Sequence, residues 1–213
     1  MKHMKDHPLE TPPEELFDVD PGTLERLRAR LGEQAGSSGE LDVAYRLLDS
    51  PLGPLLLACT ERGVVRLGYA CEGFDGVLQG LADAVGPRVL RSPSRLDEAA
   101  RQLEEYFEGR RQAFELPLDR RLSAGFRGEV QRYLPSIAYG STVSYGRIAA
   151  TLGRPRAVRA VGTACATNPL PVIIPCHRVL RADGSLGGYV GGTEAKRSLL
   201  ALEHEGWRPL SAV

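Results

Sequence analysis

Residues 139–180 read YGSTVSYGRIAATLGRPRAVRAVGTACATNPLPVIIPCHRVL, and this stretch decides the fold of the C-terminal half. Its first part predicts a helix, YGRIAATL, that Thr142 or Ser144 caps and Gly153 ends. A further helix is predicted to begin at Pro155, in its first turn. Two helices separated by a tight glycine turn are typical of a helix-turn-helix.

The second of these helices, PRAVRAVGTACA, consists almost wholly of Ala, Val and Gly around Arg156 and Arg159. Small side chains let a helix backbone approach another surface closely while the two arginines project from it. Burial against neighbouring helices explains the same composition equally well. The composition alone leaves both interpretations open.

The run NPLPVIIPCHRVL, residues 168–180, is predicted to be an extended apolar strand that ends in a turn and delivers Cys176 and His177 together. Most cysteines in apolar runs are small buried hydrophobic residues. Here an imidazole and the charge of Arg178 are available to favour the nucleophilic thiolate. The glycine-rich loop over 184–192 is either a plain flexible loop or the wall of a cavity that suits a flat heteroaromatic ring.

The rest of the chain divides into three predicted parts. Residues 1–40 are an extension, partly flexible, with one short helix that Thr23 caps and Gly32 ends. Residues 41–118 form an α/β domain, in which three strand-like runs separated by Pro and Gly turns predict an antiparallel sheet. Residues 119–213 form a helical domain, whose first helix must end or kink at Pro135.

Apolar side chains recur at helical spacing in three of these segments. The extension has a stripe of Leu24, Leu27 and Leu31; the helix that opens at Ser94 and stops at Gly109 has Leu96, Ala99, Ala100, Leu103, Tyr106 and Phe107; the helix before Pro135 has Phe126, Val130, Tyr133 and Leu134. The middle helix is expected to pack one face on the sheet.

Composition excludes several classes of protein. Among 213 residues, 42% are hydrophobic and 25% are charged, which is ordinary for a globular protein. No apolar run is long enough to span a bilayer, and no secretory segment is recognisable, so we expect a cytoplasmic protein. The four cysteines have no CxxC spacing, which argues against a zinc cluster and a disulfide framework.

The net charge of zero conceals a segregation of charge. From Arg121 to Arg181 there are nine arginines, no lysine and one acid, Glu129, whereas eight acids lie between Glu10 and Glu40. A basic block of this kind is typical of a surface that binds a polyanion, although a solvated surface without a partner is the commoner explanation. Charge alone leaves nucleic acid as one hypothesis.

The motifs together resemble the O6-alkylguanine-DNA alkyltransferase family, whose signature PCHRV occurs here as residues 175–179. The resemblance covers roughly residues 42–206 in three collinear blocks: YRLLDSPLGPLLLA, the segment from YGST to PCHRV, and GGYVGGTEAKRSLLALE. It implies a ribonuclease H-like α/β domain followed by an all-helical DNA-binding and catalytic domain. It implies no cofactor and no metal, because Cys59 and Cys71 are better interpreted as sheet core than as zinc ligands.

The resemblance assigns catalytic roles. Cys176 matches the nucleophile that attacks the alkyl carbon on guanine O6, and His177 matches the base that takes the thiol proton through a water. Glu203 matches the residue that orients the histidine; Glu205 is a near alternative, but only Glu203 gives an ungapped match back to Gly192.

Further roles follow from the same resemblance. Tyr145 matches the tyrosine that contacts the extruded base and supplies the leaving group's proton, and Asn168 matches the residue that ties the helix-turn-helix to the active-site turn. Arg159 matches the arginine that fills the gap in the base stack, because the reactive carbon is reached only after the nucleotide is flipped out. Arg156, Ala160 and Gly162 are expected to contact DNA with it; Pro171, Val179, Tyr189 and Val190 are expected to line the substrate pocket. Gln131, Pro135 and Val190 depart from residues that many or some members have.

The implied function is single-turnover repair of duplex DNA that carries O6-alkylguanine, and also of O4-alkylthymine. We expect a monomer without a membrane partner, associated with the nucleoid or, in a eukaryote, the nucleus; cooperative binding along DNA is left open. Two alternatives remain. One is a sensor of the same fold that binds alkylated bases without repair, and the other is a thiol hydrolase that uses the Cys-His pair.

Overall fold

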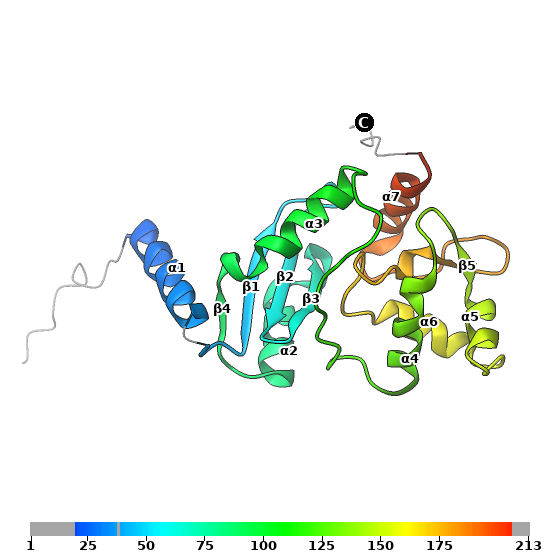
Figure 1. Ribbon diagram of the computed structural model, residues 1–213, viewed down its shortest axis with the longest axis horizontal. Helices are drawn as coiled ribbons and strands as arrows, with labels where there is room; N and C mark the ends of the chain where they lie inside the picture. Colours follow the sequence, from blue (N-terminus) through cyan, green and yellow to red (C-terminus); the bar gives the residue numbers. More distant parts are fainter. Residues whose placement is uncertain (1–19, 38, 206–213) are drawn as a thin grey trace, which may run out of the picture.

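The computed structural model describes residues 20–37 and 39–205 (Figure 1). Its N-terminal part contains α1 (Pro21–Ser37), β1 (Val43–Leu48), β2 (Leu55–Thr60), β3 (Gly63–Tyr69), α2 (Phe74–Ala84), β4 (Val89–Arg91) and α3 (Asp97–Phe107). Its C-terminal part contains α4 (Gly125–Tyr133), β5 (Val143–Ser144), α5 (Tyr145–Thr151), α6 (Val158–Ala166), β6 (Val179–Leu180) and α7 (Gly192–Glu205). No helix within the described ranges is long and apolar enough to cross a membrane.

The sheet of the N-terminal part is mixed, which corrects the prediction of an antiparallel sheet. Its strand order is β3-β2-β1-β4; β1, β2 and β3 pair antiparallel, but β4 pairs parallel to β1. A parallel neighbour needs a crossover connection, which the helix α2 supplies between β3 and β4. The three residues of β4 are too few to show an alternating pattern in the sequence.

Both faces of the sheet are covered, by α2 on one side and α3 on the other (Figure 1). All six residues of β2 are buried. Because side chains alternate along a strand, Leu56 and Ala58 pack in the cluster with Leu81 of α2, whereas Leu55 and Leu57 belong to the main core. The predicted apolar stripe of α3 is buried, and all of it except Ala100 belongs to that main core, although the α-helix begins at Asp97 after a 3₁₀ turn over Pro93–Leu96.

The N-terminal helix differs from the prediction at both ends. Asp20, rather than Thr23, occupies the capping position, since its carboxylate accepts a hydrogen bond from the Thr23 N–H. The helix continues through Gly32 to Ser37. Its leucine stripe is exposed: Leu24 by 39%, Leu27 by 56% and Leu31 by 54%. Residues 1–19 of the extension, which was predicted to be partly flexible over residues 1–40, lie outside the described residues.

The C-terminal part is helical, as predicted. The helix α4 changes at Pro135 into a 3₁₀ turn over Leu134–Ser136, and Ser144 caps α5 by accepting a hydrogen bond from the Arg147 N–H at 3.2 Å. Gly153 follows α5 with a φ of 71°. The next helix, α6, begins at Val158 and not at Pro155, because residues 154–157 form a turn closed by the Ala157 N–H and the Arg154 carbonyl.

The helix α6 packs on α4 and α5 through buried Val161 and Ala164. The predicted order of helix, glycine turn and helix is therefore present, and its role as a DNA-binding helix-turn-helix remains a prediction. The predicted domain boundary at residue 118 is also a prediction. There the chain is held on the sheet, since Leu118 bridges to Val64 and Asp119 accepts a hydrogen bond from Thr60 Oγ1 at 2.7 Å.

Candidate active site

The segment before Cys176 is a compact turn, which corrects the prediction of an extended strand. The Ile174 N–H bonds to the Leu170 carbonyl at 2.8 Å, and Cys176 itself opens a 3₁₀ turn over Cys176–Arg178. Within the turn Val172 has a φ of 70°, a left-handed conformation that is strained for a β-branched residue. Strain of this kind costs about 1–3 kcal/mol and persists only where the surrounding contacts enforce it.

Asn168 joins the end of α6 to this turn, as the resemblance implies. Its side chain is fully buried. Its Nδ2 donates to the Ile174 carbonyl at 2.8 Å and to Cys176 Sγ at 3.2 Å, while its Oδ1 accepts from the Leu170 N–H at 3.1 Å. One amide therefore fixes both the turn and the sulfur.

Cys176 is a neutral thiol in this environment. It is 1% exposed, and burial raises the pKa of its thiol to about 11, although the Asn168 amide and the charge of Lys196 act in the opposite direction. Desolvation therefore outweighs the nearby groups that favour the thiolate. A neutral thiol becomes a nucleophile only when a base takes its proton.

His177 and Glu203 form a buried pair behind the cysteine. His177 Nε2 lies 2.9 Å from Glu203 Oε1. Burial alone would raise the pKa of Glu203, but hydrogen bonds from His177, Arg178 and Tyr106 outweigh it and hold the pKa well below its usual range. Burial lowers the pKa of His177 more than Glu203 raises it, so the imidazole is neutral.

The tautomer of His177 follows from these contacts. An ionised carboxylate only accepts hydrogen bonds, so Nε2 carries the proton that it donates to Glu203. Nδ1 then holds the lone pair, and it is a buried atom without a hydrogen-bond partner among the described residues. A buried basic nitrogen with a free lone pair, on the residue next to Cys176, can accept the thiol proton.

Arg178 does not serve the sulfur, contrary to the sequence-based expectation. Its Nε and Nη2 donate to Glu203 at 2.9 and 2.8 Å, and its Nη1 donates to the Ile137 carbonyl at 2.6 Å. Tyr106 of α3 also donates its hydroxyl proton to Glu203, at 2.7 Å. Sequence reasoning had placed Tyr106 only in an apolar stripe, because the hydroxyl of a helix tyrosine carries no pattern of its own.

Lys196 is the second residue that sequence reasoning missed. Its side chain is fully buried, its Nζ donates to the Val179 carbonyl at 2.6 Å, and it lies 5.8 Å from the ring centroid of Tyr145. Burial lowers the pKa of Lys196, whereas the neighbouring Cys176 raises it. The available signal was helical spacing, since Lys196 shares a face of α7 with buried Leu199 and Glu203.

Tyr145 begins α5 and is 9% exposed. Burial is the main cause that raises its pKa to about 12, and Cys165 and Cys176 add to the rise. Its hydroxyl lies against Gly187, where a β-carbon would overlap it. The phenol therefore stays protonated at neutral pH and meets the glycine-rich loop, as a proton donor to a bound base requires.

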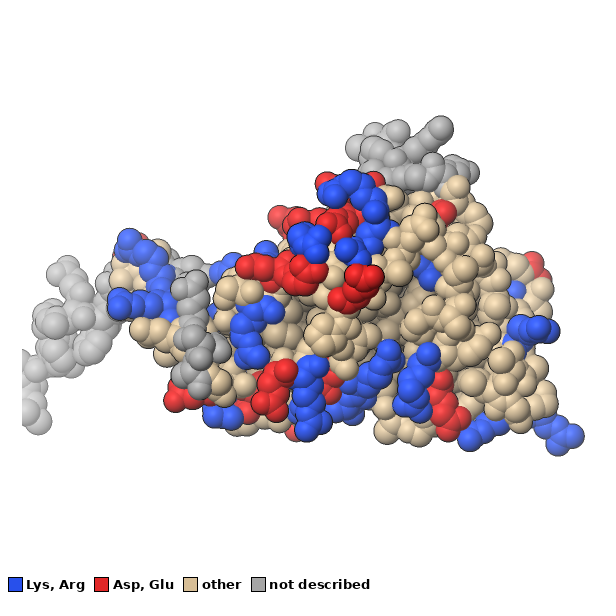
Figure 2. Space-filling view, in the orientation of Figure 1, with Lys and Arg blue, Asp and Glu red and all other residues tan. Residues whose placement is uncertain are grey.

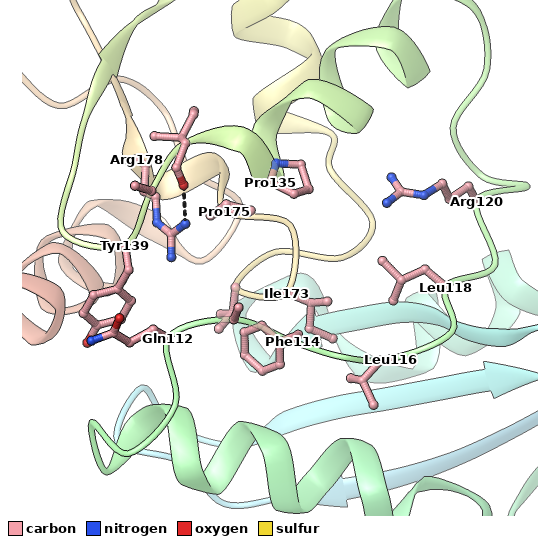
Figure 3. A pocket seen from close by; sticks show the side chains of 14 residues that line it. Gln112, Phe114, Leu116, Leu118, Arg120, Pro135, Tyr139, Ile173, Pro175 and Arg178 are labelled. Carbon is pink, nitrogen blue, oxygen red and sulfur yellow. Dashed lines mark hydrogen bonds between the residues drawn. The ribbon is translucent and has the colours of Figure 1, made fainter.

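The four predicted pocket residues occupy two segments. Pro171 and Val179 are buried beside the active-site turn, and Tyr189 (9% exposed) and Val190 lie in the glycine-rich loop. None of the four lines the cleft of about 550 Å³ in Figure 3, which lies behind the turn. Residues 112–120 line one side of that cleft. Pro135–Tyr139, together with Pro175 and Arg178, line the other side (Figure 3).

The predicted DNA-contacting residues lie on α6 and on the turn that precedes it. Arg156, Arg159 and Ala160 are exposed, and Gly162 is half-buried. We call the exposed arginines of α5, α6 and the turn between them the basic face: Arg147, Arg154, Arg156 and Arg159. In Figure 2 acidic and basic atoms are intermixed over α3, whereas the right-hand end over α5 carries basic atoms with few acidic ones.

The departures from the family pattern are accommodated locally. Gln131 of α4 is fully buried, and its amide donates to the Ala164 carbonyl of α6 at 2.9 Å, so it holds the two helices together. Cys59 lies in the sheet core, but Cys71 is exposed, which corrects its assignment to the core. Within the described ranges no group of three His, Cys, Asp or Glu side chains could hold a metal ion.

Comparison with known families decides the classification. The sequence model described as 6-O-methylguanine DNA methyltransferase, DNA binding domain, matches residues 125–205, and the model of the ribonuclease-like domain matches residues 43–120. The chain belongs to the 6-O-methylguanine DNA methyltransferase family. Its α/β part followed by a helical part is the arrangement expected from the sequence.

Individual members of the 6-O-methylguanine DNA methyltransferase family are similar along most of their length. The methylated-DNA--protein-cysteine methyltransferase of Methanosarcina barkeri is 41% identical over 77% of this chain and 99% of its own. The constitutive enzyme of that name from Bacillus subtilis is 39% identical over 75% of this chain and 94% of its own. The crystal structure of Mycobacterium tuberculosis OGT in complex with DNA superposes with a TM-score of 0.66 at 38% identity, covering 76% of this chain and 94% of that one.

Proposed function

We propose that this chain repairs alkylated DNA directly, by moving an alkyl group from O6 of guanine, and also from O4 of thymine, irreversibly onto Cys176. The names of the similar proteins from M. barkeri and B. subtilis support methyl transfer to a protein cysteine, and the M. tuberculosis structure supports DNA as the partner. The observation that carries the proposal is the lone pair of His177 Nδ1, which Glu203 leaves free next to a buried thiol.

The chemistry needs one proton to move from sulfur to the departing base. His177 Nδ1 accepts the thiol proton, through a bridging water, while Asn168 donates a hydrogen bond to the sulfur as charge develops there. The sulfur attacks the alkyl carbon in line; an S–C bond forms as the C–O bond breaks. Tyr145 donates its proton to the leaving base and regains one from solvent, to which the His177 imidazolium releases the proton that it took from the sulfur. The thioether product is stable, so each molecule reacts once.

The alkyl carbon must first leave the duplex. Flipping a nucleotide costs a few kcal/mol, which an inserted side chain offsets. Arg159 is exposed on α6, where its neighbours Ala160 and Gly162 permit close approach to the minor groove. We therefore assign Arg159 to the gap in the base stack and Arg156 to the phosphate backbone.

Mass spectrometry tests the proposal. After incubation with duplex DNA that contains O6-methylguanine, one methyl group per molecule should appear on Cys176. The tryptic peptide 160–178 holds both Cys165 and Cys176, so fragment ions must assign the position. Cys165→Ala is the matched control, and it should still accept the methyl group. A protein that stays unmodified, or is modified on another cysteine, contradicts the proposal.

The alternatives predict different outcomes. A sensor of the same fold would bind the DNA and remain unmodified; the cysteine at position 176 speaks against it, because relatives of that type replace this residue. A thiol hydrolase would regenerate its thiol and turn over many times. Excess substrate should instead give no more than one product per protein molecule.

Action on chromosomal DNA places the protein at the nucleoid of a prokaryotic cytoplasm, or in the nucleus of a eukaryote. A monomer suffices, because the nucleophile, its base and the basic face all come from one chain. Counting bound molecules per DNA length would reveal whether binding is cooperative.

A further inference from the structure

Tyr69, at the end of strand β3 in the N-terminal part, contacts the loop that borders the active site. Its hydroxyl lies 3.0 Å from the hydroxyl of Tyr189, and the two rings meet edge to face with centroids 5.9 Å apart. Tyr69 is 2% exposed and Tyr189 is 9% exposed, so neither hydroxyl has ready access to water. The proposed chemistry gives Tyr69 no role.

The next residues of the loop also contact this end of β3. A β-carbon at Gly191 would lie 2.7–2.8 Å from three carbons of the Tyr69 ring, so only glycine permits the observed approach. Cys71, two residues after Tyr69, places its Sγ 3.6 Å from the Val190 carbonyl. Three consecutive residues of the loop, 189–191, therefore rest on residues 69–71.

The Tyr69 side is held firmly. The Tyr69 N–H donates to Glu72 Oε1 at 2.8 Å, and Glu72 forms an ion pair with Arg66. The same strand contacts the other wall of the site, since the Leu67 N–H donates to the Pro169 carbonyl at 2.8 Å, next to Asn168. The end of β3 is thus a fixed support on which residues 189–191 of the loop rest.

The opposite side of Tyr189 faces the reacting groups. Its ring lies perpendicular to that of His177, with centroids 6.4 Å apart. A displacement of Tyr189 therefore changes the space beside His177, which directly follows Cys176 in the chain. Among the described residues, the hydroxyl of Tyr69 is the hydrogen-bond partner of the Tyr189 side chain, and its loss would leave the Tyr189 hydroxyl buried without a partner.

We propose that Tyr69 is a positioning residue that sets the width of the substrate pocket, and thereby restricts the size of the alkyl group that Cys176 accepts. The proposal rests on the proposed alkyl transfer. Tyr69 acts through Tyr189 and Gly191: the hydroxyl pair and the close ring contact hold the loop in its narrow position. Removing the Tyr69 hydroxyl frees the loop to move outward and admits bulkier groups.

The test compares rates of transfer from O6-methylguanine and O6-benzylguanine in the same duplex. In Tyr69→Phe the benzyl-to-methyl rate ratio should rise about fivefold, the factor associated with one net hydrogen bond. Tyr45→Phe is the matched control, because it makes the same change on β1 of the same sheet, and Tyr45 packs in the cluster with α2. Its ratio should equal that of the wild type.

Two further variants separate positioning from stability. Tyr189→Phe removes the same hydroxyl contact between Tyr69 and Tyr189 from the loop side. It replaces Tyr69→Phe in the rate comparison if Tyr69→Phe does not fold. In the double variant the change in ratio should equal that of either single variant, since both remove one contact. A melting temperature that falls while the ratio stays constant, or a ratio that falls, overturns the proposal. If the wild-type protein transfers neither the methyl nor the benzyl group, the proposed alkyl transfer is overturned and this inference falls with it. If the wild-type protein transfers both groups and Tyr69→Phe has the wild-type benzyl-to-methyl rate ratio, this inference alone is overturned.

Discussion

Replacing Glu203 with glutamine tests the buried charge network behind the reactive cysteine. Glu203 accepts hydrogen bonds from Tyr106, His177, Arg178 and the Gly140 N–H. Glutamine keeps the volume but leaves the Arg178 guanidinium, whose side chain is 7% exposed, without its counter-charge. Breaking a buried pair by removing one partner costs about 3–5 kcal/mol. Because one acceptor oxygen remains, we expect a loss of about 3 kcal/mol in the free energy of unfolding at pH 7.

Denaturant and thermal unfolding measure this loss. For a chain of this size about 3 kcal/mol corresponds to a melting temperature lower by about 6–12 °C. Glu194→Gln is the matched control on the same helix, because Glu194 pairs with Arg197 at the surface and its side chain is 75% exposed. An exposed pair contributes little, so the control should change the unfolding free energy by less than about 1 kcal/mol.

The pH dependence makes the Glu203 test sharper. The folded pKa of Glu203 is depressed, so its stabilisation is complete above the unfolded pKa of about 4.3 and is lost as pH falls toward the folded value. The difference between wild type and Glu203→Gln should therefore shrink by about 1.4 kcal/mol per pH unit below about pH 4. A difference that is constant from about pH 3 to pH 7, or equal to that of Glu194→Gln, refutes the assigned network.

The remaining predictions concern the sulfur and the basic face. Cys176→Ala should abolish methyl transfer yet keep the affinity for DNA in a gel-shift assay, because the buried thiol is no DNA contact; lost binding would contradict its role as nucleophile alone. Arg159→Ala should slow repair of duplex DNA far more than reaction with free O6-benzylguanine, and equal slowing on both would remove base flipping from its role. Iodoacetamide should label exposed Cys71 before buried Cys176. The labelling rate of Cys176, measured by mass spectrometry, should rise about tenfold per pH unit between about pH 7 and 9, because burial raises its pKa to about 11. A labelling rate that does not depend on pH would contradict the neutral thiol. Raising salt from about 50 to about 200 mM should weaken DNA binding about 100-fold if the four arginines of the basic face neutralise phosphates, and a flat response in fluorescence anisotropy would discredit that face.

Local patterns were sufficient for much of the fold. The apolar spacing of α3, the Ser144 cap and the glycine after α5 all depend on neighbours within a few residues, and each occurs where the sequence predicted it. Three features were wrong or missed for a common reason. The parallel strand β4, the turn before Cys176 and the late start of α6 depend on contacts with distant segments, which short-range periodicity does not register.

The same division applies to the site. The adjacency of Cys176 and His177 is a property of the chain, and the resemblance adds Asn168 and Glu203, which the fold brings into direct contact with them. The partners of Glu203 could not be predicted in this way. Tyr106 comes from the other part of the chain, and Arg178 turned away from the sulfur because a buried guanidinium requires a counter-charge.

The amino-acid order, with the family resemblance that it carries, predicted which groups take part in the proposed reaction: the Cys176 thiol, the His177 imidazole and the Tyr145 phenol. Tertiary structure decided their protonation and their surroundings. Desolvation keeps the Cys176 sulfur neutral, and an ionised Glu203 directs the free lone pair of His177 to Nδ1. Such effects arise from burial and from distances between segments far apart in the chain, which no local pattern encodes.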